Sequence, residues 1–220
     1  MSKFVILPIE LVYRILDQQN DCTLFFSMQN VCQRFNQILK TYHRYQTLTT
    51  LNIQSNQIGD GGAHYVADAL TTNTILITLN LSYNHISGEG IQHLSHALQI
   101  NRTLISLDLG HNEIDDKGAQ HISNALQTNT TLTTLNLGYN WIGVKGAQHF
   151  GYSLEINTGL TTLNLTNNCF GVKGAQHIVD AFETNTTLSS LELGRNGIRE
   201  EDVEHFRSAA GSPLRMVRWH

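Results

Sequence analysis

Histidine is the residue type that offers most chemistry in this chain, because 11 of its 220 residues are histidines. Five of them recur at intervals of 28 residues: His93, His121, His149, His177 and His205. Imidazole nitrogens can bind a metal or move protons, but a bound ion needs them within about 2.1 Å. Neighbouring helices stand about 8–10 Å apart, so histidines one repeat apart on them do not share an ion. We expect packing or surface roles for this column and no metal site.

Other catalytic patterns are equally weak. The two Gly-Val-Lys-Gly segments, 143–146 and 171–174, do not fit the phosphate-binding pattern G-x-x-x-x-G-K-S/T. No spacing fixes a serine, a histidine and a carboxylate together, and Cys22, Cys32 and Cys169 are scattered in the manner of reduced thiols. The sequence predicts a protein that is not an enzyme and needs no cofactor or metal.

Composition restricts the partners and the compartment. The formal net charge of −4 provides no basic surface for nucleic acid. The apolar stretches are shorter than the 18 or so residues that a membrane-spanning helix needs, and the N-terminus has no signal-peptide profile. We therefore expect a monomer in the cytoplasm, with the nucleus as an alternative, and no nucleic-acid or membrane partner.

A repeat of 28 residues organises the chain from Leu48 to Ile198. Its pattern is L-x-x-L-x-L-x-x-N-x-I, with an aromatic residue at the last position of one copy. The six copies begin at Leu48, Leu76, Leu104, Leu132, Leu160 and Leu188. This pattern resembles the leucine-rich repeat, and the length of the period resembles the ribonuclease-inhibitor type found in NLR sensors.

Each copy divides into a strand and a helix. Alternation in the first half turns residues such as Leu135 and Leu137 inward, whereas Ile122 and Leu126 share one face of a helix in the second half. One copy cannot bury its own apolar face, so the copies must stack. Strands pack about 4.8 Å apart and helices about 8–10 Å apart, so the stack must curve. The prediction is an α/β right-handed solenoid, an open horseshoe arc with parallel strands on the concave side and helices on the convex side.

Asparagines recur at two positions of the repeat. The first set should form a buried ladder that satisfies the turning backbone at the strand ends: Asn56, Asn84, Asn112, Asn140, Asn168 and Asn196. The second set follows the helices, where a left-handed asparagine commonly ends a helix: Asn73, Asn101, Asn129, Asn157 and Asn185. Ser87 and Asp115 are predicted to cap helix N-termini.

The first 44 residues do not follow the period. They read as two amphipathic helices, the first rich in apolar residues around Pro8 and the second ending in Val31, Arg34 and Phe35. This segment resembles an F-box, whose first helix has the pattern L-P-x-E-L-x-x-x-I-L. The residues that match its adaptor-binding part are Leu7, Pro8, Glu10, Leu11, Ile15 and Leu16. We divide the chain into this segment, 1–44, and a repeat domain with its C-terminal cap, 45–220.

The F-box resemblance implies a Skp1-like adaptor as a partner, and hence a substrate receptor of an SCF-type ubiquitin ligase. The alternative is a free-standing interaction scaffold in which the N-terminal helices only cover the apolar edge of the first repeat. The target is an unknown protein on the concave face. Aromatic residues and arginine dominate the energetics of protein interfaces, and the predicted site follows from this. It consists of Tyr83, His111, Tyr139, Trp141, Asn167 and Arg195. The alternative for this surface is a polar face evolved only for solubility.

Overall fold

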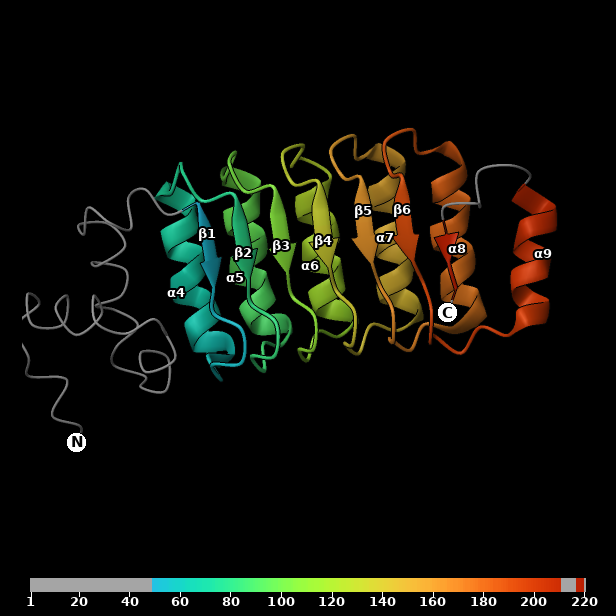
Figure 1. The fold of residues 1–220 in the computed structure, drawn as a ribbon, viewed down its shortest axis with the longest axis horizontal. Coiled ribbons are helices and arrows are strands. Elements are labelled where there is room, and N and C mark those ends of the chain that lie inside the picture. Colours follow the sequence, from blue (N-terminus) through green and yellow to red (C-terminus); the bar gives the residue numbers. More distant parts are fainter. Residues whose placement is uncertain (1–48, 211–216, 220) are drawn as a thin grey trace, which may run out of the picture.

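The computed structural model describes residues 49–210 and 217–219, in which strands and helices alternate (Figure 1). The elements are β1 (Thr50–Asn52), α4 (Gly59–Thr72), β2 (Thr78–Asn80), α5 (Gly88–Ile100), β3 (Ser106–Asp108), α6 (Asp116–Leu126), β4 (Thr134–Asn136), α7 (Val144–Ile156), β5 (Thr162–Asn164), α8 (Gly171–Thr184), β6 (Ser190–Glu192), α9 (Glu200–Ala210) and β7 (Val217–Arg218). Leu48 and the F-box-like residues 1–44 lie outside the described residues, so that segment stays a prediction.

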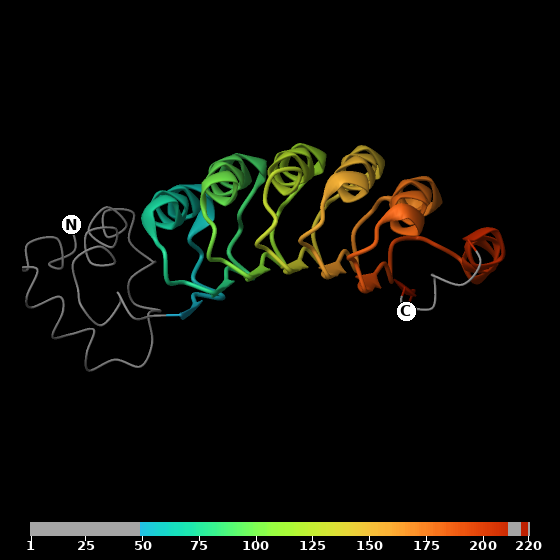
Figure 2. The ribbon, with the colours of Figure 1, turned by 90° about the horizontal axis from the view of Figure 1, so that it is seen from above.

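The strands form one parallel sheet in chain order, β1 to β7. Leu51 pairs with Leu79, Leu79 with Leu107 and so on, so the register of the sheet is the 28-residue period itself. Seen from above, the strands line the inner side of a shallow arc and the helices its outer side (Figure 2). The predicted α/β arc, with strands concave and helices convex, is confirmed.

The core lies between the two layers. In repeat four, Leu135 of β4 and Leu137, directly after the strand, contribute to this core, and both are fully buried. The helical face predicted in repeat three is buried as well, including Ile122 and Leu126. The buried residues of all six repeats form one continuous cluster along the solenoid.

The first asparagine ladder is confirmed, and each of its steps connects two consecutive repeats. The Asn112 Nδ2 group donates to the carbonyls of Leu109 and Gly110 in its own repeat and of Leu81 in the preceding one. Its Oδ1 atom accepts from the backbone N–H groups of Asn84 and Ile86. One side chain therefore satisfies five backbone groups at a place where the chain turns and cannot bond to itself.

The second asparagine set does not adopt the predicted left-handed conformation. Asn101 ends α5 with φ −66° and ψ 134°, which is extended backbone. Its Nδ2 group instead donates to the carbonyls of Leu70 and Asn73, and its Oδ1 accepts from the N–H groups of Thr103 and Leu104. The physical reason is that these asparagines act through their side chains, as a second ladder at the other edge of the solenoid.

Helix starts are capped partly from within a repeat and partly from the preceding repeat. The Ser87 and Asp115 side chains accept from Glu89 and Gly118 N–H groups in their own helices, as predicted. Gly143, at the start of α7, has no side chain for this role. There the carboxylate of Asp116, from the preceding repeat, accepts from the N–H groups of Gly143 and Gly146, at 2.7 and 2.8 Å.

At the C-terminal end, where the sequence predicts a cap, a strand closes the solenoid. β7 pairs with β6, and Val217 and Trp219 are buried. The Trp219 ring stacks on Phe206 of α9, with centroids 5.4 Å apart. The remaining residues of the predicted cap, 211–216 and 220, lie outside the described residues.

The Asn112→Ala substitution tests the first ladder. It leaves five backbone groups without their partner, and a buried unsatisfied group costs about 1–3 kcal/mol. We expect urea unfolding to show a loss of at least about 3 kcal/mol in the free energy of unfolding. Asn124→Ala, on the exposed face of α6, is the control and should change it by less than about 0.5 kcal/mol. Equal losses in both variants would contradict the ladder as the main constraint.

Candidate functional site

One position of the repeat, directly before each ladder asparagine, lies just past the C-terminal end of each strand. It is occupied by Ser55, Tyr83, His111, Tyr139, Asn167 and Arg195. The backbone N–H of each residue from Tyr83 to Asn167 donates to the next repeat, as in the bond from Tyr83 to the Gly110 carbonyl. The position therefore extends the strand ladder and sets its side chains in a row along one edge of the concave sheet.

All six residues at this position have a left-handed backbone, with φ between 53° and 60°. Glycine, asparagine and aspartate adopt this region easily, whereas bulky side chains adopt it at a cost of about 1 kcal/mol or more. Asn167 is the residue type that the backbone favours. Tyr83 and Tyr139 are not, and three rings at consecutive repeats are a departure from what the turn alone requires.

The three rings stack on one another. The centroid of His111 lies 3.9 Å from that of Tyr83 and 4.0 Å from that of Tyr139, with interplanar angles of 11° and 12°. Arg195 reaches back across the repeat of Asn167 and donates from Nη1 to the Tyr139 hydroxyl, at 3.1 Å. We call Tyr83, His111 and Tyr139 the aromatic column. The structure thus brings five of the six predicted residues into one row.

The surface beside the aromatic column is flat because its residues are small. The Asp108 and Asn136 side chains accept from the N–H groups of Gly110 and Gly138, and Asn136 also donates to Asp108. A Cβ atom at Gly110 would lie 3.0 Å from the Asn136 amide nitrogen. Glycine is therefore needed for the close approach of the Asn136 side chain to residue 110. The large side chains lie at the edge of this surface of small polar residues.

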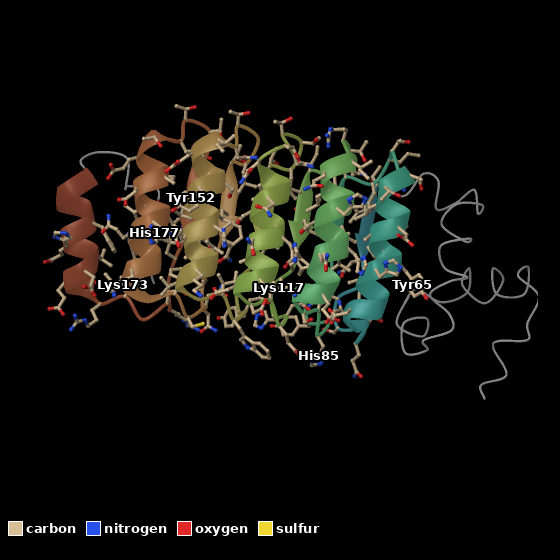
Figure 3. All side chains as sticks on the ribbon, turned by 180° about the vertical axis from the view of Figure 1, so that it is seen from behind. Tyr65, His85, Lys117, Tyr152, Lys173 and His177 are labelled. Atoms are coloured by element: carbon tan, nitrogen blue, oxygen red, sulfur yellow. The ribbon has the colours of Figure 1, made fainter. Side chains whose placement is uncertain are left out.

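Trp141 lies in the next loop position outward, two residues after Tyr139, and 61% of its surface is exposed. Its equivalents in neighbouring repeats are Glu113 and Cys169. The His85 Nδ1 and Glu113 Oε1 atoms are 2.8 Å apart at this same edge, where Figure 3 shows His85 below the helices. The sixth predicted residue therefore belongs to a second row beside the aromatic column.

Two histidines have perturbed pKa values. Burial between the tyrosine rings lowers the pKa of His111, and the nearby Asp108 carboxylate partly opposes this. Burial also lowers the pKa of His121, with a further lowering from Lys117 and an opposing effect of Asp115. The buried Nε2 atom of His121 has no hydrogen-bond partner, which agrees with a packing role for this ring.

Little in the described residues can perform catalysis. Burial, together with the charge of Asp116, raises the pKa of the Cys169 thiol, which holds it in its unreactive form. Within residues 49–210 and 217–219, no three histidine, cysteine or carboxylate side chains lie close enough to hold a metal. None of the helices described is long and apolar enough to cross a membrane. The arrangement offers a binding surface.

Sequence reasoning placed the aromatic residues in one row, because a fixed period puts equal positions side by side. It missed the stacking of the rings, the left-handed backbone beneath them and the contact from Arg195 to Tyr139. It also missed the caps that one repeat gives to the next. Asp60 and Asp116 occupy the same position two repeats apart, and this recurrence is the signal that could have indicated these caps.

Two solved structures share the fold. Leiomodin-1 Actin-Binding Site 2 (ABS2) matches with a TM-score of 0.59 and 24% sequence identity, over 68% of this chain and 86% of that one. The tropomodulin C-terminal domain of Caenorhabditis elegans matches with a TM-score of 0.58 and 12% identity, over 70% of this chain and 92% of that one. A comparison with curated protein sequences gives no match.

The family comparison agrees with the period read from the sequence. Six segments match the family described as Leucine Rich repeat: residues 46–67, 72–95, 101–123, 128–151, 157–179 and 184–205. Together they make up more than half of the chain, and they coincide with the strand and helix pairs of the solenoid. The protein therefore belongs to the leucine-rich repeat family.

Proposed function

We propose that this protein is an interaction scaffold that binds a protein partner at the edge of its concave sheet, with the aromatic column and Trp141 as the anchor. The observation that carries the proposal is the conflict between backbone and side chain in the aromatic column. The left-handed turn favours asparagine or glycine at this position, yet three consecutive repeats use a large ring. Stacking offsets part of this cost, and a bound partner supplies a reason for the remainder.

The exposure of these rings suits an anchor. Tyr83 and Tyr139 are 45% and 37% exposed, and each has an apolar ring held rigidly with a hydroxyl at its tip. Tyrosine, tryptophan and arginine dominate the energetics of protein interfaces. The lowered pKa of His111 keeps its imidazole neutral at pH 7, so the column is an uncharged aromatic surface at that pH.

The ubiquitin-ligase role rests on the sequence resemblance of residues 1–44 to an F-box, above all at Leu7, Pro8 and Leu11. In this version of the proposal, the N-terminal helices bind a Skp1-like adaptor while the solenoid binds the target. The alternative keeps the same binding edge in a scaffold whose N-terminal helices only cap the first repeat. The two versions differ in the adaptor alone.

Actin enters only as a comparison ligand. The leiomodin-1 structure is, by its title, an actin-binding site, but at 24% identity the likeness concerns the fold. Including actin in the binding assays tests whether the shared fold extends to a shared partner.

The first prediction for this site uses Tyr83→Asn with Tyr139→Asn. Asparagine accepts the left-handed backbone, as Asn167 does in repeat five, so the substitutions remove the rings without adding strain. Peptides selected by phage display on the wild type should bind the double variant more weakly by more than about 1 kcal/mol. The free energy of unfolding should stay within about 1 kcal/mol of the wild type, because stacking is lost while strain is relieved.

Tyr152→Asn is the matched control. Tyr152 is 53% exposed on α7, on the convex side (Figure 3). We expect this variant to bind the selected peptides as the wild type does. Loss of binding in Tyr152→Asn, with full binding in the column variant, would assign the partner to the convex side and reject the proposed edge.

A second prediction separates the two versions of the function. Purified wild-type protein should bind a purified Skp1-like adaptor in a titration, and Leu7→Ala with Pro8→Ala should abolish that binding without lowering the melting temperature of the solenoid. If the wild type does not bind while a known F-box protein does under the same conditions, the scaffold version replaces the ligase version.

A third prediction concerns pH. The pKa of His111 in the folded protein is below 6.5, so the unfolded state binds more protons as the pH falls past that value. The resulting contribution to stability is present above about pH 6.5 and is lost as the pH falls through the folded pKa. The free energy of unfolding should therefore fall less steeply between pH 7 and 5 in His111→Asn than in the wild type. Parallel curves in urea titrations would show that His111 is not protected by the column.

A further inference from the structure

The distribution of lysines in the repeat domain is unusual. Residues 49–220 contain three lysines, Lys117, Lys145 and Lys173. All three are exposed and lie in the first turns of the consecutive helices α6, α7 and α8. Figure 3 shows Lys117 and Lys173 at the same edge of the solenoid as His85. The lysines are therefore one row along the edge that also carries Trp141.

These lysines have no ion-pair partner among the residues described. By contrast, Arg199 pairs with Glu201 and Asp202, and Arg218 pairs with Glu192. The carboxylates nearest in sequence to Lys117 are those of Asp115 and Asp116, and both accept hydrogen bonds from helix N-termini instead.

Helix stability does not explain the row. A cation in the first turn opposes the helix dipole and costs about 0.3–1 kcal/mol. The first turns of α4, α5, α6 and α9 contain acidic residues, but those of α7 and α8 contain none. Asp116 reaches α7 from the preceding repeat, whereas its equivalent facing α8 is Val144. The charge of Lys173, at the start of α8, is thus the least compensated of the three.

Apolar surface lies beside this charge. Trp141 is 61% exposed and Val144 is 40% exposed, both on the segment that joins β4 to Lys145. We call Trp141, Val144, Lys145 and Lys173 the basic apolar island. Trp141, Val144 and Lys145 lie six residues or fewer along the chain from Tyr139, and Lys173 holds the position of Lys145 in the next repeat, so the island continues the aromatic column around the edge toward the helices.

Acidic residues border the island on both sides. Glu89, Glu113 and Asp115 precede it, and the carboxylates of Glu200, Glu201 and Asp202 follow it. A long polyanion such as nucleic acid would meet these carboxylates, so the island fits a short negative ligand. Helices stand about 8–10 Å apart, which an extended chain spans in about three residues.

We propose that the basic apolar island binds a short acidic segment of a protein partner, with carboxylates two to four residues apart beside a large apolar side chain. The carboxylates lie against Lys145 and Lys173, and the apolar side chain against Trp141 and Val144. This inference rests on the proposed scaffold function and adds the chemistry of the partner.

The test uses three fluorescein-labelled nine-residue peptides with the same Leu-Phe-Leu centre, flanked by glutamate, glutamine or lysine. Fluorescence anisotropy with the full chain should show the tightest binding for the glutamate peptide. Each exposed charge pair is worth roughly two- to fivefold in affinity, so Lys145→Gln with Lys173→Gln should weaken that peptide roughly tenfold. Raising the salt to about 1 M, where the Debye length is about 3 Å, should remove most of its advantage over the glutamine peptide.

Arg102→Gln is the charge-matched control, because Arg102 is exposed beyond the C-terminal end of α5, at the opposite edge. It should change binding by less than about twofold. The wild type could bind the glutamate and glutamine peptides equally well and lose both in the variant Tyr83→Asn with Tyr139→Asn. That result would keep the proposed function and overturn the acidic ligand. Equal weakening by Arg102→Gln and the lysine variants, or no binding of any peptide, would overturn the island. If none of the three peptides binds, the scaffold function is still tested independently, by the binding of the peptides selected by phage display.

Discussion

The backbone at the end of each strand is the constraint on which the structure depends. Strands of three residues leave the chain to turn inside the protein, where unsatisfied N–H and carbonyl groups are costly. The ladder asparagine solves this with one side chain that bonds to its own repeat and to the preceding one. Because each asparagine needs the preceding repeat in a fixed place, the ladder also fixes the register of the whole sheet.

This register gives the surface its character. Any residue type that recurs at the period becomes a continuous row, whether or not the solenoid needs it. The turn before the ladder asparagine imposes a left-handed backbone on every repeat, and in three repeats this position holds the stacked rings of the aromatic column. The repeat therefore explains why these side chains form a row, but it does not require tyrosine and histidine at these positions.

The two edges of the solenoid carry different kinds of side chain. The edge after the helices is occupied by the second asparagine ladder, whose side chains are engaged with the backbone. The edge after the strands combines the aromatic column, Trp141 and the unpaired lysines. The polar side chains that hydrogen-bond to the backbone point inward. The large or charged side chains that make no such bonds lie together at the edge after the strands. A partner that binds there can do so without disturbing the repeat.

The sequence by itself determined the period, the alternation of strand and helix, the buried leucines and the first ladder, since each depends only on local spacing repeated six times. It also placed Tyr83, His111 and Tyr139 in one row. Only the tertiary structure decided how the rings stack, that Arg195 meets Tyr139 two repeats away, and that Asp116 caps the next helix. The second asparagine set shows the reason. A residue type such as asparagine permits both a left-handed turn and a side-chain bridge, and the choice depends on which carbonyls the neighbouring repeat brings within reach.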